Sequence, residues 1–122
     1  GKFYIFLSKI EFMIKYDVQF LESAKEFLDS IDKKPREKIL FNIWKSRETN
    51  DPKLFKKLNN NIWEFRTLYS RKQYRLFAFW VKHENQMKLV IATHGIIKKT
   101  QKTPKSEIEK AEQLRIEYLE NE

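Results

Sequence analysis

The stretch Tyr74-Arg75-Leu76-Phe77-Ala78-Phe79-Trp80-Val81 decides the fold of this chain. Read as an extended strand, it carries apolar side chains on both faces, with Arg75 as its one charged residue. A strand that is covered on both sides lies in the middle of a sheet. Because successive side chains alternate, Arg75 shares its face with Phe77 and Phe79. We therefore predict a central strand here.

The segment Ile62–Leu68 predicts a strand that precedes the central one. Its side chains alternate, so that Trp63 and Phe65 share one face. Glu64 and Arg66 share the other face, which we expect to be the less buried of the two. This pattern sets a carboxylate beside a guanidinium.

Two more segments predict strands. Ile14–Phe20 alternates between apolar and polar residues, which is typical of a half-buried strand. Lys88–Thr93 is an apolar run that follows a turn at His83-Glu84-Asn85-Gln86. It predicts a further strand close to the central one.

Two short helices are predicted after the first strand. Ser23, with Glu26 three residues later, forms a capping box, and the helix it opens is expected to end near Asp32. A second helix opens at Pro35, a residue suited to a first helical turn, and stops before Asn50-Asp51-Pro52. The residues that we expect these helices to bury are Ala24, Phe27, Leu28 and Ile31 in the first and Ile39, Leu40, Ile43 and Trp44 in the second.

A last helix is predicted from Thr103-Pro104 onward. The predicted order is β-α-α-β-β-β-α, an α+β fold in one small domain, with an antiparallel-rich sheet and a helical hairpin packed on one face. The inner side of the last helix is expected to carry Ile108, Ala111, Leu114, Arg115 and Tyr118.

Composition narrows the class of protein. The chain has 122 residues, of which 41% are hydrophobic and 15% aromatic, enough apolar surface for one folded core. It has no cysteine, which excludes disulfides and thiolate metal sites and fits a reducing cytoplasm. Two histidines cannot form a structural zinc site, and we expect neither metal nor cofactor. Residues 1–12 contain no signal peptide or membrane span; we expect an N-terminal extension there, a tag or non-native start, and the domain at 13–122.

The positive charge is concentrated in the middle of the chain. The formal net charge is +8, yet thirteen Lys or Arg residues and only two acidic ones lie between Pro52 and Lys105. The rest of the chain is therefore slightly acidic. Such a local excess favours binding to a polyphosphate, although a solvated basic face gives the same composition.

The segment Gly95–Pro104 gathers part of this charge at the exit of the Lys88–Thr93 strand. It lacks the glycine pattern with which backbone amides hold phosphates, so an anion must be held by side chains. In an extended segment Lys98 and Lys102 would point the same way and Lys99 the opposite way. We therefore rank Lys98 and Lys102 above Lys99 as ligands of an anion.

Four motifs occur in order along the chain. They are Leu54-Phe55-Lys56-Lys57-Leu58, Ile62-Trp63-Glu64-Phe65-Arg66, Tyr74-Arg75-Leu76-Phe77 and Lys98-Lys99-Thr100-Gln101-Lys102-Thr103-Pro104, the last followed by Glu107-Ile108-Glu109-Lys110-Ala111. Together they resemble the RelE/ParE toxin superfamily, and most of all its HigB-like, phage-derived branch. The resemblance extends over about Ile14–Leu119 and agrees with the predicted order of elements. It implies the toxin of a type II toxin–antitoxin pair, which cleaves mRNA on the ribosome without a metal and is silenced by a helix-turn-helix, HigA-like antitoxin.

Metal-free RNA cleavage needs cations around the phosphate and groups that move protons. The resemblance points most strongly to Arg75, and Arg66 is the second guanidinium, unless it serves only as a structural partner of Glu64. The unperturbed pKa of histidine lies near neutrality, so His94 could act as a proton shuttle, but it could equally be a hydrogen-bonded structural residue at a strand end. Glu64 is the alternative base. The full predicted set is Arg75, Arg66, Lys98, Lys102, His94 and Glu64 for catalysis, and Lys56, Lys57, Arg71, Lys72 and Lys99 for RNA binding.

Two rival functions fit the same resemblance. A ParE-like toxin would use this fold as a protein ligand that poisons DNA gyrase. An inactive relative would bind RNA through its basic face with no chemistry. Supercoiling inhibition would distinguish the first rival, and binding without cleavage the second.

Overall fold

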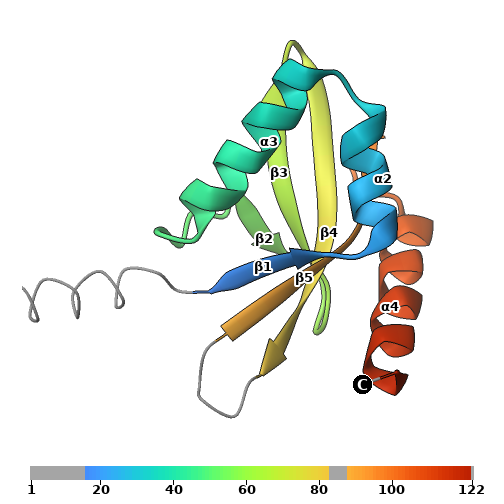
Figure 1. Ribbon diagram of the computed structural model, residues 1–122. Coiled ribbons are helices and arrows are strands. Elements are labelled where there is room, and N and C mark those ends of the chain that lie inside the picture. Colours follow the sequence, from blue (N-terminus) through green and yellow to red (C-terminus); the bar gives the residue numbers. More distant parts are fainter. Residues whose placement is uncertain (1–15, 83–87, 122) are drawn as a thin grey trace, which may run out of the picture.

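The computed structural model describes residues 16–82 and 88–121, and Figure 1 shows the arrangement of their elements. A five-stranded sheet has the strand order β1-β5-β4-β3-β2. Neighbouring strands are antiparallel except for β1, which runs parallel to β5. The elements in chain order are β1 (Asp17–Phe20), α2 (Glu22–Ser30), α3 (Lys33–Ser46), β2 (Phe55–Lys57), β3 (Trp63–Tyr69), β4 (Lys72–Lys82), β5 (Lys88–Lys98) and α4 (Lys105–Glu120).

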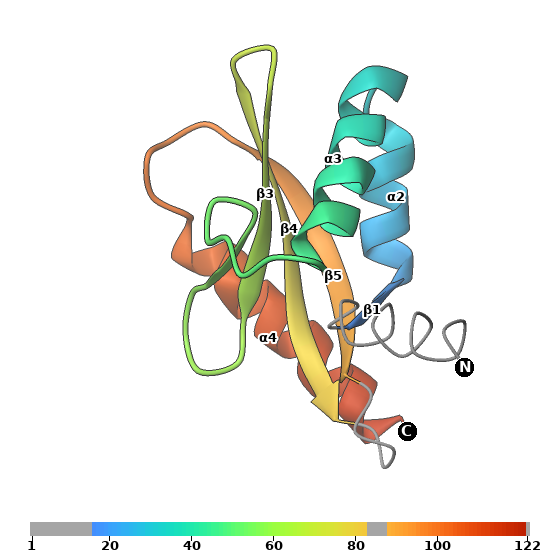
Figure 2. The same ribbon diagram turned by 90° about the vertical axis from the view of Figure 1, so that its left-hand side faces the viewer.

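The predicted α+β fold class is confirmed. The helical hairpin α2–α3 covers one face of the sheet, and Figure 2 shows α4 starting on the opposite side. Strand β4 lies in the middle of the sheet, as its two apolar faces predict. The sheet therefore separates a hairpin face from an α4 face.

The side chains of β4 divide between two cores. Tyr74 and Leu76 pack on the hairpin face with residues of α2 and α3. Phe77 and Phe79 are fully buried on the α4 face, where Ala111 of α4 packs against the same cluster. Because Arg75 has the parity of Phe77, it too lies on the α4 face.

The predicted order of elements missed one strand. Residues 55–57 form β2, which pairs with β3, so the observed order is β-α-α-β-β-β-β-α. Three residues are too few to show an alternation, and two of them are exposed lysines that look like part of a loop. Because β2 is the edge strand beside β3, it brings Lys56 into register with Glu64.

The predicted capping box at Ser23 is wrong, whereas the last helix begins where Thr103-Pro104 predicts. Helix α2 begins at Glu22, and Ser23, inside the helix, donates its hydroxyl to the carbonyl oxygen of Thr93 on β5. Helix α4 begins at Lys105, and the Thr103 hydroxyl donates to Glu64. Both hydroxyls therefore make tertiary contacts that fasten a helix to the sheet.

Three predictions of burial are also wrong. Leu40 and Trp44 of α3 are 41% and 52% exposed, since α3 contacts the sheet mainly through Ile39 and Ile43. Glu64, expected on the less buried face, is only 2% exposed. The residues that follow β5 cover it, because Thr103 bonds to its carboxylate.

The last strand is longer than predicted. Strand β5 continues beyond Thr93 to Lys98, so His94 and Gly95 are strand residues. The predicted turn at 83–86, the first residues of the predicted Ile14–Phe20 strand and the predicted extension at 1–12 lie outside the described residues. Within residues 16–82 and 88–121, no helix is long and apolar enough to span a membrane.

Candidate functional site

Four cationic side chains from four adjacent strands converge on the α4 face. Arg66 of β3 lies directly opposite Arg75 of β4, and Lys56 of β2 lies opposite Glu64. Lys98, the last residue of β5, pairs with the residue two positions before Arg75. We call Lys56, Arg66, Arg75 and Lys98, with Glu64 among them, the cation cluster.

Glu64 lies at the centre of the cation cluster. Its Oε1 accepts a hydrogen bond from Thr103 Oγ1 at 3.0 Å and lies 3.6 Å from Arg75 Nε. Its Oε2 lies 3.6 Å from Arg66 Nε. One buried carboxylate thus holds two guanidinium groups and the segment that leads into α4.

Arg75 is almost completely buried. Its side chain is 2% exposed, and its terminal nitrogens donate to the backbone oxygen of Tyr74 at 3.0 Å and to Gln73 Oε1 at 2.8 Å. Burial lowers the pKa of Arg75, with Arg66 acting in the same direction and Glu64 opposing it. Arg75 therefore faces Glu64 and its own strand.

The solvent-facing cations of the cluster are Arg66, Lys98 and Lys56. Arg66 is 30% exposed, Lys98 is partly exposed and Lys56 is exposed. Partial burial lowers the pKa of Lys98, and the charge of Arg75 adds to this effect while Glu64 opposes it. Lys98 therefore gives up its proton more readily than an ordinary lysine.

Two nitrogens of the cation cluster lack a full hydrogen bond. Arg66 Nε and Arg75 Nε are buried and have no hydrogen-bond partner among the described residues. Their distances of 3.6 Å to Glu64 are those of ion pairs and too long for hydrogen bonds. A buried donor without an acceptor is costly, so the attraction of the Glu64 carboxylate must offset this cost for both arginines.

His94 lies on the α4 face but takes part in a different set of contacts. Its Nε2 is 2.9 Å from Glu107 Oε2 of α4, and its Nδ1 is 3.1 Å from Thr93 Oγ1. Its ring stacks on Phe77, and the residue is 3% exposed. Burial lowers the pKa of His94, against the hydrogen bond to Glu107, which raises it. Its Nε2 thus fastens α4 to the sheet, while its Nδ1 is engaged with the neighbouring residue of β5.

The remaining predicted cations are scattered. Residues 100–102 bend, with the Thr100 hydroxyl donating to the Lys102 carbonyl oxygen, so the extended segment assumed for Lys98 and Lys102 does not form. Lys57 follows Lys56 and points to the hairpin face. Arg71 and Lys72 lie at the tip of the β3–β4 hairpin, where Ser70 and Arg71 have positive φ angles. Lys99, Lys102, Lys57, Arg71 and Lys72 are all exposed.

Sequence reasoning missed the residues that support the cluster. Gln73, Thr103 and Glu107 each bond a predicted site residue, namely Arg75, Glu64 and His94. Thr103 stands within a motif of the resemblance, but no pattern of spacing indicates that its hydroxyl reaches back to β3. Among the described residues, no group of three His, Asp or Glu side chains could hold a metal.

Fold and site together define a small, basic α+β domain whose sheet gathers cations on one face. The chain belongs to the family of phage-derived Gp49-like proteins, whose model matches residues 26–115. This is a family of RelE/HigB-like toxins, which confirms the resemblance seen in the sequence and implies an antitoxin partner. A comparison with curated proteins finds no significant match.

Proposed function

We propose that this chain is a ribosome-dependent endoribonuclease that cleaves mRNA, the toxin of a type II toxin–antitoxin pair. The observation that carries the proposal is the cation cluster, in which four strands bring guanidinium and ammonium groups together on one face of the sheet. Family membership supports the toxin class. The substrate, mRNA on a ribosome, sets the site of action in the cytoplasm.

The proposed reaction is attack of a ribose 2′-oxygen on the adjacent phosphorus. A bond forms between that oxygen and phosphorus as its proton passes to a base, and the bond to the 5′-oxygen breaks as that oxygen takes up a proton from an acid or from water. The products are a 2′,3′-cyclic phosphate and a 5′-hydroxyl. Negative charge grows on the non-bridging oxygens in the transition state. Fixed cations that are already in position stabilise this charge.

We assign contact with the phosphate to Arg66, Lys98 and Lys56, because these are the cations of the cluster that reach solvent. Arg75 and Glu64 are buried and act as positioning residues, since Glu64 pairs with Arg66 and Arg75 bonds Gln73, the residue opposite Lys98. The exposed Lys57, Arg71, Lys72 and Lys99 remain proposals for RNA binding, and Lys102, which we predicted for catalysis, is now proposed for RNA binding instead.

Lys98 is our choice for proton transfer. Its lowered pKa makes proton exchange with the substrate easier than for an ordinary lysine, and its charged form remains one of the cations of the cluster. His94 is the weaker choice in this arrangement, because both its ring nitrogens have partners and its side chain is buried. Glu64 is likewise engaged with two arginines and Thr103.

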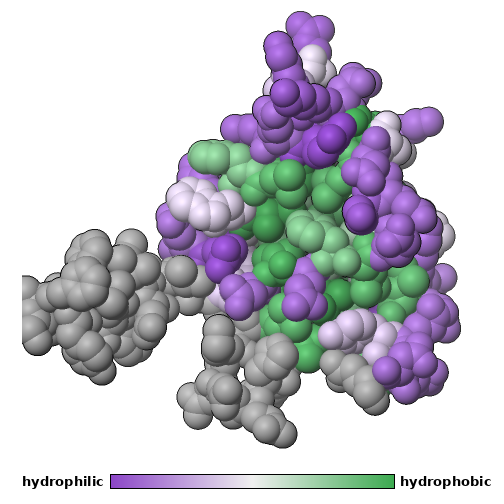
Figure 3. Space-filling view, viewed as in Figure 1, coloured by the Kyte–Doolittle hydropathy of each residue, from purple (hydrophilic) through white to green (hydrophobic). Residues whose placement is uncertain are grey.

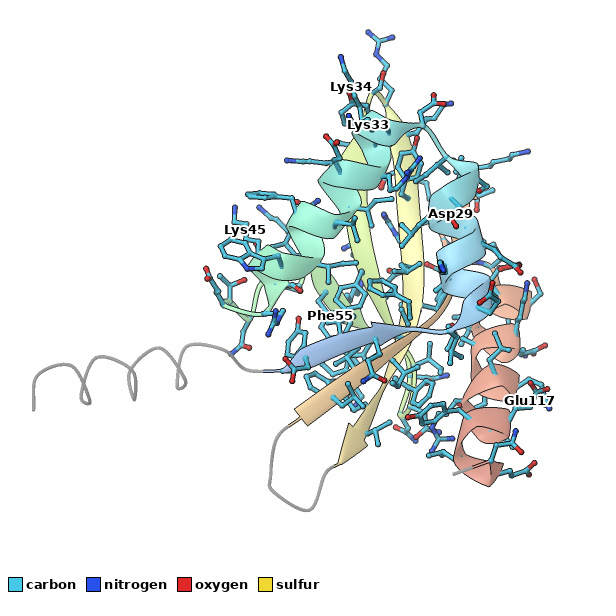
Figure 4. The ribbon with its side chains drawn as sticks, in the orientation of Figure 1. Asp29, Lys33, Lys34, Lys45, Phe55 and Glu117 are labelled. Carbon is cyan, nitrogen blue, oxygen red and sulfur yellow. The ribbon has the colours of Figure 1, made fainter. Side chains whose placement is uncertain are left out.

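The test is primer extension on a defined mRNA with purified bacterial ribosomes, alongside a control without ribosomes. Arg66→Ala and Lys98→Gln should each reduce cleavage about 100-fold or more, since each removes a cation from the transition state. Lys34→Gln is the matched control. Lys34 is an exposed lysine near the start of α3, which covers the sheet face opposite the cation cluster (Figure 4). It should cleave like the wild type.

Arg75→Ala is a poorer test, because it removes one of the two guanidinium partners of the buried Glu64 and so endangers the fold. A folded wild-type chain that makes no cuts would contradict the proposal. Inhibition of gyrase supercoiling by that same chain would favour the ParE-like rival instead.

A further inference from the structure

A pocket of about 520 Å³ opens on the hairpin face, between the end of α3 and strand β2. Its volume lies within the range of small-ligand sites, about 300–1,000 Å³. Four aromatic side chains line it, namely Tyr16, Phe55, Trp63 and Trp80, and we call it the aromatic pocket. It is separate from the apolar surface that Figure 3 shows between α3 and α2.

Two tryptophans form the accessible wall of the aromatic pocket. Trp63 and Trp80 are half-buried, and their rings stand at 80° to each other with 5.9 Å between the centroids. Phe55 stacks on Trp63 at 4.9 Å, and Tyr16 packs edge-on against Trp80 at 4.9 Å. Phe55 and Tyr16 are buried, so they hold the two indoles in place from behind. A rigid aromatic wall of this kind is a platform on which a nucleobase stacks.

The rim of the aromatic pocket carries both signs of charge. Asp51 lies between α3 and β2, and its Oδ1 accepts the backbone amide of Lys53 at 2.9 Å. Lys56 and Lys57 of β2 line the pocket as well, and both are exposed. One carboxylate beside two lysines selects neither a simple anion nor a simple cation. It suits a nucleotide, because the phosphate attracts ammonium groups and the edge of the base offers amino hydrogens to a carboxylate.

Strand pairing sets Lys57 beside the tryptophan wall. Lys57 lies directly opposite Trp63 in the register of β2 and β3, and the two side chains share the hairpin face. Directly opposed side chains are close neighbours, with about 4.5–5.5 Å between their Cβ atoms. A base that stacks on Trp63 therefore has an ammonium group near its own phosphate.

The aromatic pocket adjoins the cation cluster through Lys56. This residue lines the pocket and also lies opposite Glu64, at the centre of the cluster. Because β2 is the edge strand of the sheet, single-stranded RNA can run around it from the α4 face to the hairpin face. Lys56 and Lys57 alternate on β2 and offer a cation on each side of this edge.

We propose that the aromatic pocket binds the base of a nucleotide that neighbours the cleaved phosphate. Trp63 stacks on the base, Asp51 accepts a hydrogen bond from its amino group, and Lys57 holds its phosphate. The pocket thereby selects adenine, cytosine or guanine at that position over uracil, which has no amino group. The inference rests on the proposed function and specifies how its RNA substrate is chosen.

The first test measures RNA binding by the full chain without ribosomes. Trp44→Phe removes one of the three tryptophans, and the other two both line the pocket. Trp44 is 52% exposed on α3, so the fold should survive. The probe is an oligoadenylate of about eight nucleotides with 2′-methoxy groups, which prevent attack on the phosphates, and the control is the same backbone without bases. The oligoadenylate should quench the tryptophan emission and bind about tenfold more tightly than the abasic control.

Three substitutions in this Trp44→Phe chain assign the contacts. Trp63→Leu should lower the affinity for oligoadenylate about tenfold and leave that for the abasic control unchanged. Lys57→Gln should weaken the binding of both probes and reduce the salt slope by about one. Asp51→Ala should lower the preference for oligoadenylate over oligouridylate about tenfold. Lys34→Gln is the matched control for Lys57→Gln and should bind both probes like its parent.

Several results would overturn the proposal. They are equal quenching by the abasic control, an unchanged base preference in Asp51→Ala, and quenching by adenosine monophosphate as strong as that by oligoadenylate, which would make the pocket a site for free nucleotides. Circular dichroism checks each variant. If Trp63→Leu does not fold, the quenching in its parent and the base preference of Asp51→Ala still decide the outcome.

Cleavage on ribosomes separates this inference from the proposed function. Asp51→Ala should change which codons are cut while cutting continues. A chain that binds base-bearing RNA as described but cuts no mRNA would sink the proposed function alone. Wild-type cleavage with an unchanged choice of codons in Asp51→Ala and Trp63→Leu would sink only the inference about the pocket.

Discussion

Glu64 connects three separate parts of the chain through one carboxylate. It faces Arg75, Arg66 and Thr103, and its side chain is 3% exposed. Glu64→Gln keeps the size of the side chain and an acceptor for Thr103 but leaves two guanidinium charges unbalanced, one of them buried. We expect a loss of about 3–5 kcal/mol in the free energy of unfolding, measured by urea denaturation.

Arg66→Gln serves as the comparison for this loss. Because Arg66 is partly exposed, its removal should cost about 1 kcal/mol or less. Equal losses in the two variants would mean that Glu64 is no more important to the fold than a surface ion pair.

His94 predicts a pH dependence of stability. Its surroundings are Phe77 and Thr93 on the sheet and Glu107 and Lys110 on α4, and burial lowers its pKa below 6.5. The unfolded chain therefore takes up a proton, as the pH falls below 6.5, before the folded chain does. The contribution of His94 to the free energy of unfolding is fully present above pH 6.5 and is lost as the pH falls through the folded-state pKa of His94.

Urea midpoints measured between about pH 5 and pH 8 check this prediction. Stability should fall on the acid side in the wild type, and His94→Gln should flatten that part of the curve. A wild-type curve that rises toward acid would instead mean that the charged pair with Glu107 outweighs burial.

At the scale of elements, Gly95 allows α2 to lie close on β5. A Cβ at this position would come within 2.6 Å of ring atoms Cε2 and Cγ of Phe27. Gly95→Ala should therefore destabilise the fold by about 1–3 kcal/mol through overpacking. Phe27→Leu in the same chain makes room for the methyl group, so the double variant should lose less than the sum of the two single losses in urea unfolding. Additive losses would contradict the contact.

Periodicity predicted the elements whose patterns are long. The seven-residue strand β3 appears where alternation indicated it, the eleven-residue strand β4 where a run apolar on both faces indicated it, and the three helices where their patterns did. Strand β2 was missed because three residues show no period. The cap at Ser23 failed because its hydroxyl bonds Thr93, far away in the sequence, which no local rule includes.

The same limit applies to the candidate site. Alternation alone sets Glu64 and Arg66 on one face, and pairing with β4 brings Arg75 opposite Arg66. The burial of Glu64 and Arg75 could not be predicted, because it depends on the sheet register and on the loop closed by Thr103. The bend at residues 100–102 likewise separates Lys102 from the extended arrangement that its spacing suggested.

For the whole molecule, the sheet separates two chemically different surfaces. The α4 face carries the cation cluster, and the hairpin face carries the exposed apolar side chains Leu40, Phe41 and Trp44 of α3. Polar contacts join α4 to its face of the sheet, since Glu64 and His94 each bond the segment between Thr103 and Glu107.

The parallel pairing of β1 with β5 also affects how the protein folds during its synthesis. The first strand finds its neighbour only after some seventy residues more have been made, since Val18 pairs with Val90. Such distant pairing delays folding until late in synthesis. Lys98 is the last member of the cation cluster to leave the ribosome. A nascent chain of this protein therefore has no assembled cation cluster until β5 has been synthesised and can pair with β4.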